Sequence, residues 1–221
     1  MNNAEVAAFF DFDKTLLEVE SAKLGIKFMW DMRQISLWYI AKVLAANIFY
    51  QRHLFSDMAM ARLLIKFYKG KRLDEFEAGA PMFYQEVVKP HLAPNILARV
   101  HEHKARGHRL VLISAGVRYL LKPVVEDLGF DNLFCTDLEV GPDGLLTGKA
   151  HGPICIDENK KIFTLKLAEE QGIDLEKSFA YGNHQSDIAF LELVGNPFVV
   201  EPTEPLRKMA IKRSWPILSF R

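Results

Sequence analysis

Short apolar runs alternate with helix-like stretches along most of the chain. The runs are rich in β-branched and aromatic residues and end at turn-forming residues, which is typical of buried strands. The intervening segments have the length and composition of helices. This alternation predicts an α/β fold, with a Rossmann-like parallel sheet covered by helices on both faces. The expected strands are residues 6–12, 109–114, 133–140, 178–183 and 197–202, and the expected helices are 94–106, 117–128, 159–171, 187–193 and 204–212.

Residues 17–91 interrupt the alternation. This segment is rich in helix formers and in large apolar residues such as Phe28, Trp30 and Trp38, and it carries no strand signal. We interpret it as a helical cap domain inserted after the first strand, so that residues 1–16 and 92–221 form the Rossmann-like core. Near the third strand, the turn residues 142–144 lie between short apolar pieces and predict a β-hairpin.

The most apolar part of the insertion is "ISLWYIAKVLAANIFY", residues 35–50. A membrane span needs about 20 such residues, so 16 residues that include Lys42 do not favour one. Two interpretations remain. The segment is either a helix that is buried in or covers the cap, or a surface that meets lipid or a lipid-like substrate.

Composition excludes several classes of protein. The chain has 221 residues, with 28 Lys plus Arg against 28 Asp plus Glu, and this balance gives no indication of a nucleic-acid partner. Its two cysteines, Cys135 and Cys155, are far apart, as expected of unpaired thiols in a reducing cytoplasm. The first residues lack the basic start of a signal peptide, so we expect a cytoplasmic protein of open oligomeric state.

Polar residues gather where the expected strands end. Asp11 and Asp13 follow the first strand at positions i and i+2, so their side chains share a face and repel one another. A metal ion, a nearby cation or open solvent must offset that repulsion. Ser114 ends the second strand and Asn183 the fourth. Ligands of open α/β sheets bind at this edge, so these residues predict a binding site there.

In their order along the chain, these elements resemble the motifs of the haloacid dehalogenase-like superfamily, in its phosphoserine-phosphatase-like branch (subfamily IB). The resemblance covers essentially the whole chain. Its third motif is a lysine, which we assign to Lys161 because aliphatic residues follow it, with Lys160 as the alternative. The motifs stand here as Asp11-Phe12-Asp13-Lys14-Thr15, "LVLIS" ending in Ser114, "KKIFTL" from residue 160, and Gly182-Asn183-His184-Gln185-Ser186-Asp187.

The resemblance implies a Mg²⁺-dependent phosphatase that works through an aspartyl-phosphate. Asp11 would be the nucleophile and Asp13 the general acid and base, with Lys161 holding the nucleophile and a phosphoryl oxygen. The hydroxyl of Ser114 and the backbone N–H of Ala115 would hold other phosphoryl oxygens. Thr15 would brace the loop.

The implied magnesium ligands are Asp11, Asp13 through its backbone carbonyl, Asn183 and Asp187. The family usually has an acid where this chain has Asn183, so weaker metal binding is expected unless Asp187 compensates, directly or through a water. A non-catalytic phosphate-binding module is the alternative that this amide raises.

The substrate is less well determined than the chemistry. Glu20 and, on a weaker alignment, Arg62 occupy positions that meet the amino and carboxylate groups of phosphoserine in relatives. They favour a small phosphorylated metabolite such as phosphoserine. The apolar segment 35–50 favours the alternative, a lipid phosphate such as phosphatidylglycerol phosphate or lysophosphatidate, with the cap touching the membrane. A phosphotransferase also stays open.

Overall fold

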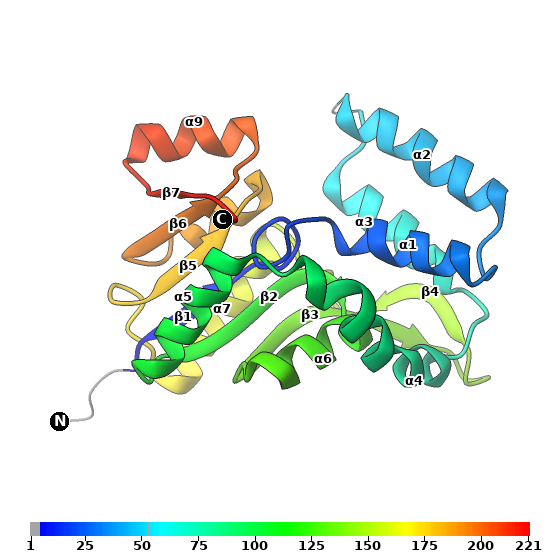
Figure 1. Cartoon of the computed structure of the whole chain (residues 1–221), viewed down its shortest axis with the longest axis horizontal. Helices are drawn as coiled ribbons and strands as arrows, with labels where there is room; N and C mark the ends of the chain where they lie inside the picture. Colours follow the sequence, from blue (N-terminus) through cyan, green and yellow to red (C-terminus); the bar gives the residue numbers. More distant parts are fainter. Residues whose placement is uncertain (1–4, 53) are drawn as a thin grey trace.

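The computed structural model describes residues 5–52 and 54–221, and they form a seven-stranded sheet in the order β4-β3-β2-β1-β5-β6-β7 (Figure 1). All neighbouring strands run parallel except β3 and β4, which form the predicted hairpin. The predicted α/β fold is confirmed. The strands are β1 (Ala7–Phe10), β2 (Arg109–Val117), β3 (Asn132–Val140), β4 (Leu146–His151), β5 (Phe179–Gly182), β6 (Asn196–Val200) and β7 (Ile217–Leu218).

Helices cover both faces of this sheet, and a further group lies between β1 and β2 in the chain. The inserted helices are α1 (Ser21–Asp31), α2 (Leu37–Gln51), α3 (Asp57–Ile65) and α4 (Leu73–Phe83). A π-helical turn, Tyr84–Val88, continues α4. The remaining helices are α5 (Pro94–Ala105), α6 (Arg118–Leu128), α7 (Glu158–Gln171), α8 (Ile188–Leu191) and α9 (Glu204–Arg213).

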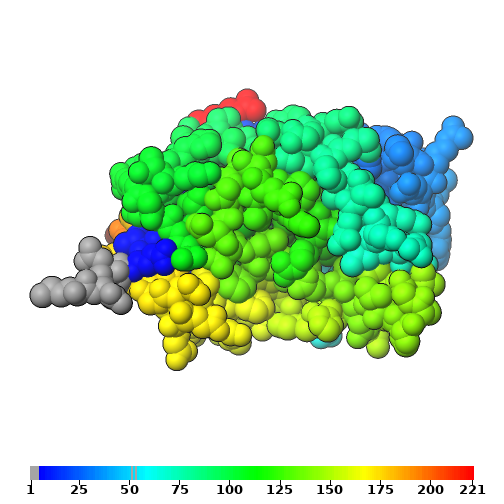
Figure 2. Space-filling view, turned by 90° about the horizontal axis from the view of Figure 1, so that it is seen from below, coloured from blue at the N-terminus to red at the C-terminus, as the bar shows by residue number. Residues whose placement is uncertain are grey.

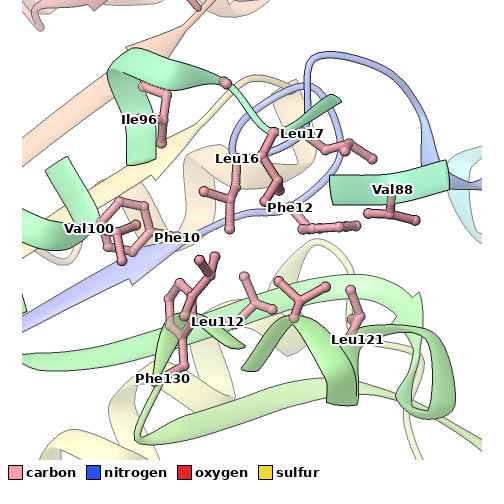
Figure 3. Packing of buried hydrophobic residues seen from close by; sticks show 14 of the residues in the cluster. Phe10, Phe12, Leu16, Leu17, Val88, Ile96, Val100, Leu112, Leu121 and Phe130 are labelled. Atoms are coloured by element: carbon pink, nitrogen blue, oxygen red, sulfur yellow. The ribbon is translucent and has the colours of Figure 1, made fainter. Parts of the chain in front are cut away.

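Both faces of the central strand β1 are buried, because its side chains alternate between two cores. Ala8 and Phe10 pack with α5 and α6 in the first core, which Figure 3 shows from close by. Ala7 and Phe9 pack with α7, α8 and α9 in the second. Burial on both sides explains why this strand reads as a continuous apolar run, since each large side chain removed from water contributes about 1.5–3 kcal/mol.

The hairpin β3–β4 connects the sheet to the inserted helices. Gly70, after α3, donates its N–H to the carbonyl of Leu146 at 2.8 Å, and Leu146 donates to the carbonyl of Lys71 at 2.8 Å. Gly148 has a φ of +77°, and a Cβ there would lie 2.9 Å from that of Lys69, so only glycine permits this contact. Figure 2 shows the yellow-green hairpin directly against the teal segment after α3.

Helix α2 leaves much of its apolar surface in water. Trp38 is 81% exposed, Leu37 72% and Leu44 59%, so this segment is not buried in the cap, and its position agrees with the remaining alternatives, a helix that covers the cap or a surface that meets lipid. Within residues 5–52 and 54–221, each helix is too short or too polar to cross a lipid bilayer, α2 included.

Candidate active site

The residues predicted from the strand ends meet at one cavity of about 1100 Å³. Its lining includes Asp11 and Asp13 after β1, Ser114 and Ala115 of β2, and Asn183 after β5. We call it the strand-end cavity. In Figure 1 the loop that leaves β1 leads directly into α1, so the first inserted helix starts at this cavity.

Asp11 is held from three sides. Its N–H donates to the carbonyl of Tyr181 in β5 at 2.9 Å, which continues the pairing of β1 with its neighbour. Thr15 returns to it through a turn in which Lys14 has a φ of +59°, and the hydroxyl of Thr15 donates to Asp11 Oδ2 at 3.1 Å. Lys160 Nζ donates to Asp11 Oδ1 at 2.7 Å. The carboxylate is therefore fixed in one orientation before any ligand binds.

The lysine of the site is Lys160, and the choice of Lys161 is wrong as to position. Lys160 is buried with its Nζ 2.6 Å from Asp187 Oδ1 as well as 2.7 Å from Asp11, whereas Lys161 pairs with Glu158 on the outer side of α7. The residues that argued for Lys161, Ile162 and Leu165, are themselves exposed.

Helical periodicity accounts for this placement once the packed face of α7 is known. Lys160, Thr164 and Leu167 recur at i, i+4 and i+7 and form the buried stripe of α7. A lysine one position later lies about 100° around the helix and cannot face the same cavity.

Burial and neighbouring charges act in opposite directions on the protonation of Asp11 and Lys160. Burial raises the pKa of Asp11, and Lys160 opposes the rise while Asp187 and Asp13 add to it. Burial alone would lower the pKa of Lys160, but the two carboxylates beside it raise that pKa above its ordinary value. Lys160 therefore stays an ammonium ion over any physiological pH.

Asp13 is bound to the start of α1. Its Oδ2 accepts a hydrogen bond from the hydroxyl of Ser21 at 3.1 Å, and its Oδ1 accepts from the backbone N–H of the same residue. An anion is favoured at a helix N-terminus, since the first N–H groups have no partner within the helix. Burial raises the pKa of Asp13, and the bonds from Ser21 oppose the rise.

Asp187 braces the loop that follows β5. Its Oδ2 accepts from the N–H groups of Asn183 and His184, both at 2.9 Å, and its Oδ1 accepts from Lys160. Because both oxygens are engaged, these contacts favour a supporting role over the expected direct coordination of a metal. The side-chain amide of Asn183 makes no hydrogen bond within the described part of the chain, and it lines the cavity.

The end of β2 provides hydroxyl and amide groups. The register between β2 and β3 shifts after Ile113, so the strand departs from regular pairing at Ser114 and Ala115. Ser114 is buried, and its hydroxyl accepts from the N–H of Gly116 at 3.1 Å. The hydroxyl of Thr136 in β3 donates to the carbonyl of Ala115 at 2.9 Å, which fixes this irregular part of β2.

The two residues expected to bind substrate are not brought together. Glu20 lines the strand-end cavity and pairs with Lys23 at 2.9 Å. Arg62 is exposed on α3 and is not among the residues that line the cavity, so its position does not support the expected contact with a substrate carboxylate. It lies one position from Ala61 and two from Leu64, which face inward.

A polar contact that was not predicted joins the inserted helices to the loop after β5. Tyr50, at the end of α2, donates to Asp57 Oδ1 at 2.6 Å and lies 3.4 Å from His184 Nε2. All three residues line the strand-end cavity. Tyr50 and His184 are 134 positions apart, and no local pattern relates them.

The oxygen donors at this edge fit a hard divalent cation. When ionised, Asp11, Asp13 and Asp187 carry three negative charges against the one ammonium of Lys160, an excess of two. Among the described residues, no three or more His, Cys, Asp or Glu side chains are grouped to hold a metal. Of the four predicted ligands, Asp187 already has both oxygens engaged. The other three are Asp11, the amide oxygen of Asn183 and the backbone carbonyl of Asp13, all of them oxygen ligands that Mg²⁺ accepts.

The fold and the site together define a class: an α/β protein that binds its ligand at the carboxyl ends of parallel strands, beneath an inserted group of helices. The chain belongs to the haloacid dehalogenase-like hydrolase family, whose model matches residues 8–192. Within it, the chain is a phosphatase of the phosphoserine-phosphatase-like branch, which confirms the resemblance drawn from the motifs.

Relatives support this placement over nearly the full chain. A histidinol-phosphatase of Neisseria meningitidis is 27% identical over 224 residues, which cover 97% of this chain and 98% of the relative. A phosphoserine phosphatase of Mycobacterium tuberculosis is 26% identical over 97% of this chain and 71% of its own length. A crystal structure of a Bordetella pertussis protein of unknown function has a TM-score of 0.87 at 24% identity and covers 99% of this chain and 100% of its own.

Proposed function

We propose that this chain is a Mg²⁺-dependent phosphomonoesterase that works through a phosphorylated Asp11. The observation that carries the proposal is the buried contact of Asp11 with Lys160 at 2.7 Å, beside a second acid, Asp13, that faces the same cavity. A carboxylate is a weak nucleophile, so it needs fixed orientation and a phosphoryl group whose charge is neutralised. Thr15 and Lys160 fix the orientation of Asp11, and the ammonium of Lys160 neutralises part of the phosphoryl charge.

In the first half-reaction, a carboxylate oxygen of Asp11 forms a bond to phosphorus while the bond from phosphorus to the leaving oxygen breaks. Asp13, in its acid form, gives its proton to that oxygen, and burial favours this form. In the second half, Asp13 takes a proton from water as the water oxygen bonds to phosphorus, and the bond to Asp11 breaks. Phosphate leaves, and both aspartates regain their starting states.

Three other groups hold the transferring phosphoryl group. Lys160 offers an ammonium beside Asp11, and Ser114 with the backbone N–H of Ala115 offers neutral donors. When bound, Mg²⁺ would neutralise phosphoryl charge, and Asp11, the carbonyl of Asp13 and Asn183 are the residues that would hold it. Asp187 would keep Lys160 and the Asn183 loop in place through the hydrogen bonds described above.

The relatives' names favour small phosphomonoesters, since one is a histidinol-phosphatase and another a phosphoserine phosphatase. Glu20, at the rim of the strand-end cavity, could meet the amino group of such a substrate. The exposed position of Arg62 removes the partner first assigned to a phosphoserine carboxylate. We therefore propose a phosphomonoester without requiring a zwitterionic leaving group.

The experiment is a phosphatase assay with and without EDTA on the wild type, Asp11→Asn and the matched control Asp143→Asn. Asp143 is an exposed acid in the hairpin turn. We expect Asp11→Asn to lower kcat by at least about 10³-fold and EDTA to remove activity, while Asp143→Asn behaves as the wild type. Turnover by Asp11→Asn, or turnover that EDTA does not affect, would overturn the proposal.

A further inference from the structure

A second cavity of about 310 Å³ lies between α1, α3, α4 and the start of α6. We call it the apolar cavity. It adjoins the strand-end cavity, because Asp13, Ala22, Ile26, Leu64 and Ala115 line both. Its opening toward the site therefore lies at Asp13, the residue proposed to protonate the leaving group. Hydrocarbon and aromatic side chains make up most of its wall, among them Phe28, Met29, Ile35, Phe67, Phe76 and Phe83.

Its polar groups offer little to a charged ligand. The hydroxyls of Tyr68 and Tyr119 bond to each other at 2.8 Å, so each already has a partner. Gln34 and Glu75 also line the cavity, and both are solvent-exposed. Within the described chain no lysine or arginine lines it, so the carboxylate of a phosphorylated amino acid would find no cation there.

Two glycines keep the cavity open. Gly25 in α1 and Gly79 in α4 both line it, and a Cβ added at either would meet nothing within 4 Å. Neither has the positive φ that requires glycine. Glycine inside a helix costs about 1 kcal/mol relative to alanine. Helix formation and packing therefore both favour a larger residue at these positions, and the unfilled space is a feature that the fold does not need.

We propose that the apolar cavity receives the leaving group of the substrate, and that this group is a hydrocarbon chain. The inference rests on the proposed function and names its substrate class: a phosphomonoester with the phosphate at Asp11 and the chain extending past Asp13 and Ala115, between α1 and α4. Gly25 and Gly79 set the width available to the chain. The volume falls at the lower end of the ~300–1,000 Å³ common for small-molecule sites, which suits a single chain.

The outer surface of the same helices indicates where such a substrate would be met. Leu37, Trp38, Leu44, Phe49 and Leu54 are all at least half exposed on or beside α2. Residues 21–52 carry five basic side chains and a single acidic one, Asp31. An exposed apolar helix with a basic surround fits an anionic lipid surface, where single-chain phosphates partition.

The test compares n-butyl phosphate, n-octyl phosphate and O-phosphoserine as soluble substrates, each below its aggregation concentration. We expect kcat/KM to rise with chain length, by up to about fourfold for each methylene that enters the cavity, and to be at least about tenfold higher for octyl than for butyl phosphate. O-phosphoserine should be poorer than octyl phosphate.

Gly79→Phe, which fills the cavity, should bring the octyl-to-butyl ratio close to one. Ala78→Phe is the matched control, since Ala78 is the exposed neighbour on α4 and lies outside the lining, and it should keep the wild-type ratio. Gly25→Leu tests the opposite wall if Gly79→Phe does not fold. The wild-type series is itself decisive, because Asp11-dependent turnover without a chain-length effect would overturn the inference and leave the proposed function intact.

Experiments with vesicles distinguish whether the hydrocarbon chain of the substrate comes from a lipid surface or from a dissolved amphiphile. Vesicles with anionic lipid and a long-chain alkyl phosphate should bind the wild type in a flotation assay and support its turnover, whereas neutral vesicles should bind less. Chain-length dependence without flotation would contradict the lipid surface and identify dissolved amphiphiles as the source. A folded dimer that hides α2 in solution would do the same.

Discussion

At the scale of single residues, the active site is a buried charge cluster in which one ammonium serves two carboxylates. Lys160 lies 2.7 Å from Asp11 and 2.6 Å from Asp187, with all three side chains nearly inaccessible to water. Removing one partner of such a pair leaves a buried charge uncompensated, which typically costs about 3–5 kcal/mol. The same lysine should therefore matter for both folding and activity.

Replacement of the two adjacent lysines by methionine separates these contributions. Lys160→Met should lower the free energy of unfolding by about 3 kcal/mol and kcat by at least about 10³-fold. Lys161→Met should change the free energy of unfolding by less than about 0.5 kcal/mol and kcat by less than about twofold, because the ion pair of Lys161 with Glu158 is at the surface. Urea unfolding and steady-state kinetics measure both, and equal effects of the two replacements would contradict the assignment.

A buried histidine makes stability depend on pH. His103 in α5 lies 2.9 Å from the hydroxyl of Tyr181 and 2.9 Å from His108, and burial, with the charge of His108 next, lowers its pKa to about 4. The pKa of His103 is lower in the folded protein than in the unfolded chain, where it is near 6.5. The folded state therefore has its full stability at pH values above about 6.5 and loses stability as the pH falls toward about 4, because the unfolded chain binds the proton first.

Urea unfolding at pH 7, 5.5 and 4 measures this effect. The wild type should lose about 2 kcal/mol more over that range than His103→Gln, which cannot titrate. The variant is expected to be less stable at pH 7, because it loses the bond to Tyr181, so the comparison is between the two pH dependences. Parallel curves would show that His103 is not the titrating group.

Residue identity in the site was largely predictable from sequence, but side-chain direction was not. The acids after β1 were predicted from the end of a strand, and so was Ser114, although β2 continues three residues beyond it to Val117. Lys160 and Lys161 differ by one position, and only the tertiary packing of α7 decides which of them faces inward. The placement of Arg62 at the site was not supported for the same reason, since Arg62 lies on the exposed side of α3.

At the scale of elements, α1 positions Asp13, the proposed general acid. Asp13 accepts from both the N–H and the hydroxyl of Ser21, the first residue of this helix, so the acid and the inserted helices form one unit. The orientation of Asp13 therefore depends on Ser21, which is not among the residues that line the strand-end cavity.

Ser21→Ala removes the hydroxyl and leaves the backbone donor. We expect kcat to fall about tenfold with little change in KM, since a hydrogen bond to a charged group contributes about 1.5–3 kcal/mol and part of it orients Asp13. The control is Ser36→Ala, which removes the cap of α2 and costs about 1 kcal/mol of stability without touching the site. A kcat loss of the same size in both variants would mean that Ser21 acts only through stability.

Elements of the core were more predictable than the surface of the insertion. Every expected strand and core helix is present within a few residues, because both faces of the sheet are buried and the apolar runs are therefore long. The two-residue strand β7 has no such pattern and was missed. The exposed apolar face of α2 was one of two interpretations of residues 35–50, and sequence could not decide between them because periodicity does not distinguish a buried apolar helix from an exposed one. The division at residues 16/17 and 91/92 stays a prediction.

At the scale of the whole molecule, the topology collects residues far apart in the chain. β1 lies between β2 and β5, so Asp11 and Asn183, which directly follow β1 and β5, lie close to Ser114 in the C-terminal part of β2, and α7 adds Lys160 from one face. The excess negative charge of this edge is the feature that a divalent cation would offset. Asn183 is an amide at the position where the motif of the resemblance implies an acid, so the excess is one charge smaller than that motif would give.

Asn183→Asp tests the metal requirement. The added carboxylate should lower the Mg²⁺ concentration for half-maximal activity by about tenfold, while EDTA abolishes turnover in both wild type and variant. Activity titrated with Mg²⁺ from a metal-free preparation measures the shift, and thermal unfolding without metal serves as the control for folding. An unchanged Mg²⁺ requirement would place the metal away from Asn183.

The most direct measurement is chemical trapping of the phosphorylated enzyme. Rapid quenching during turnover, followed by borohydride reduction, converts an aspartyl-phosphate into homoserine, and mass spectrometry of the digested protein locates it. The account predicts homoserine at Asp11, in the wild type and not in Asp11→Asn. Active enzyme that yields homoserine at no position, or at Asp13 or Asp187 instead, would contradict it.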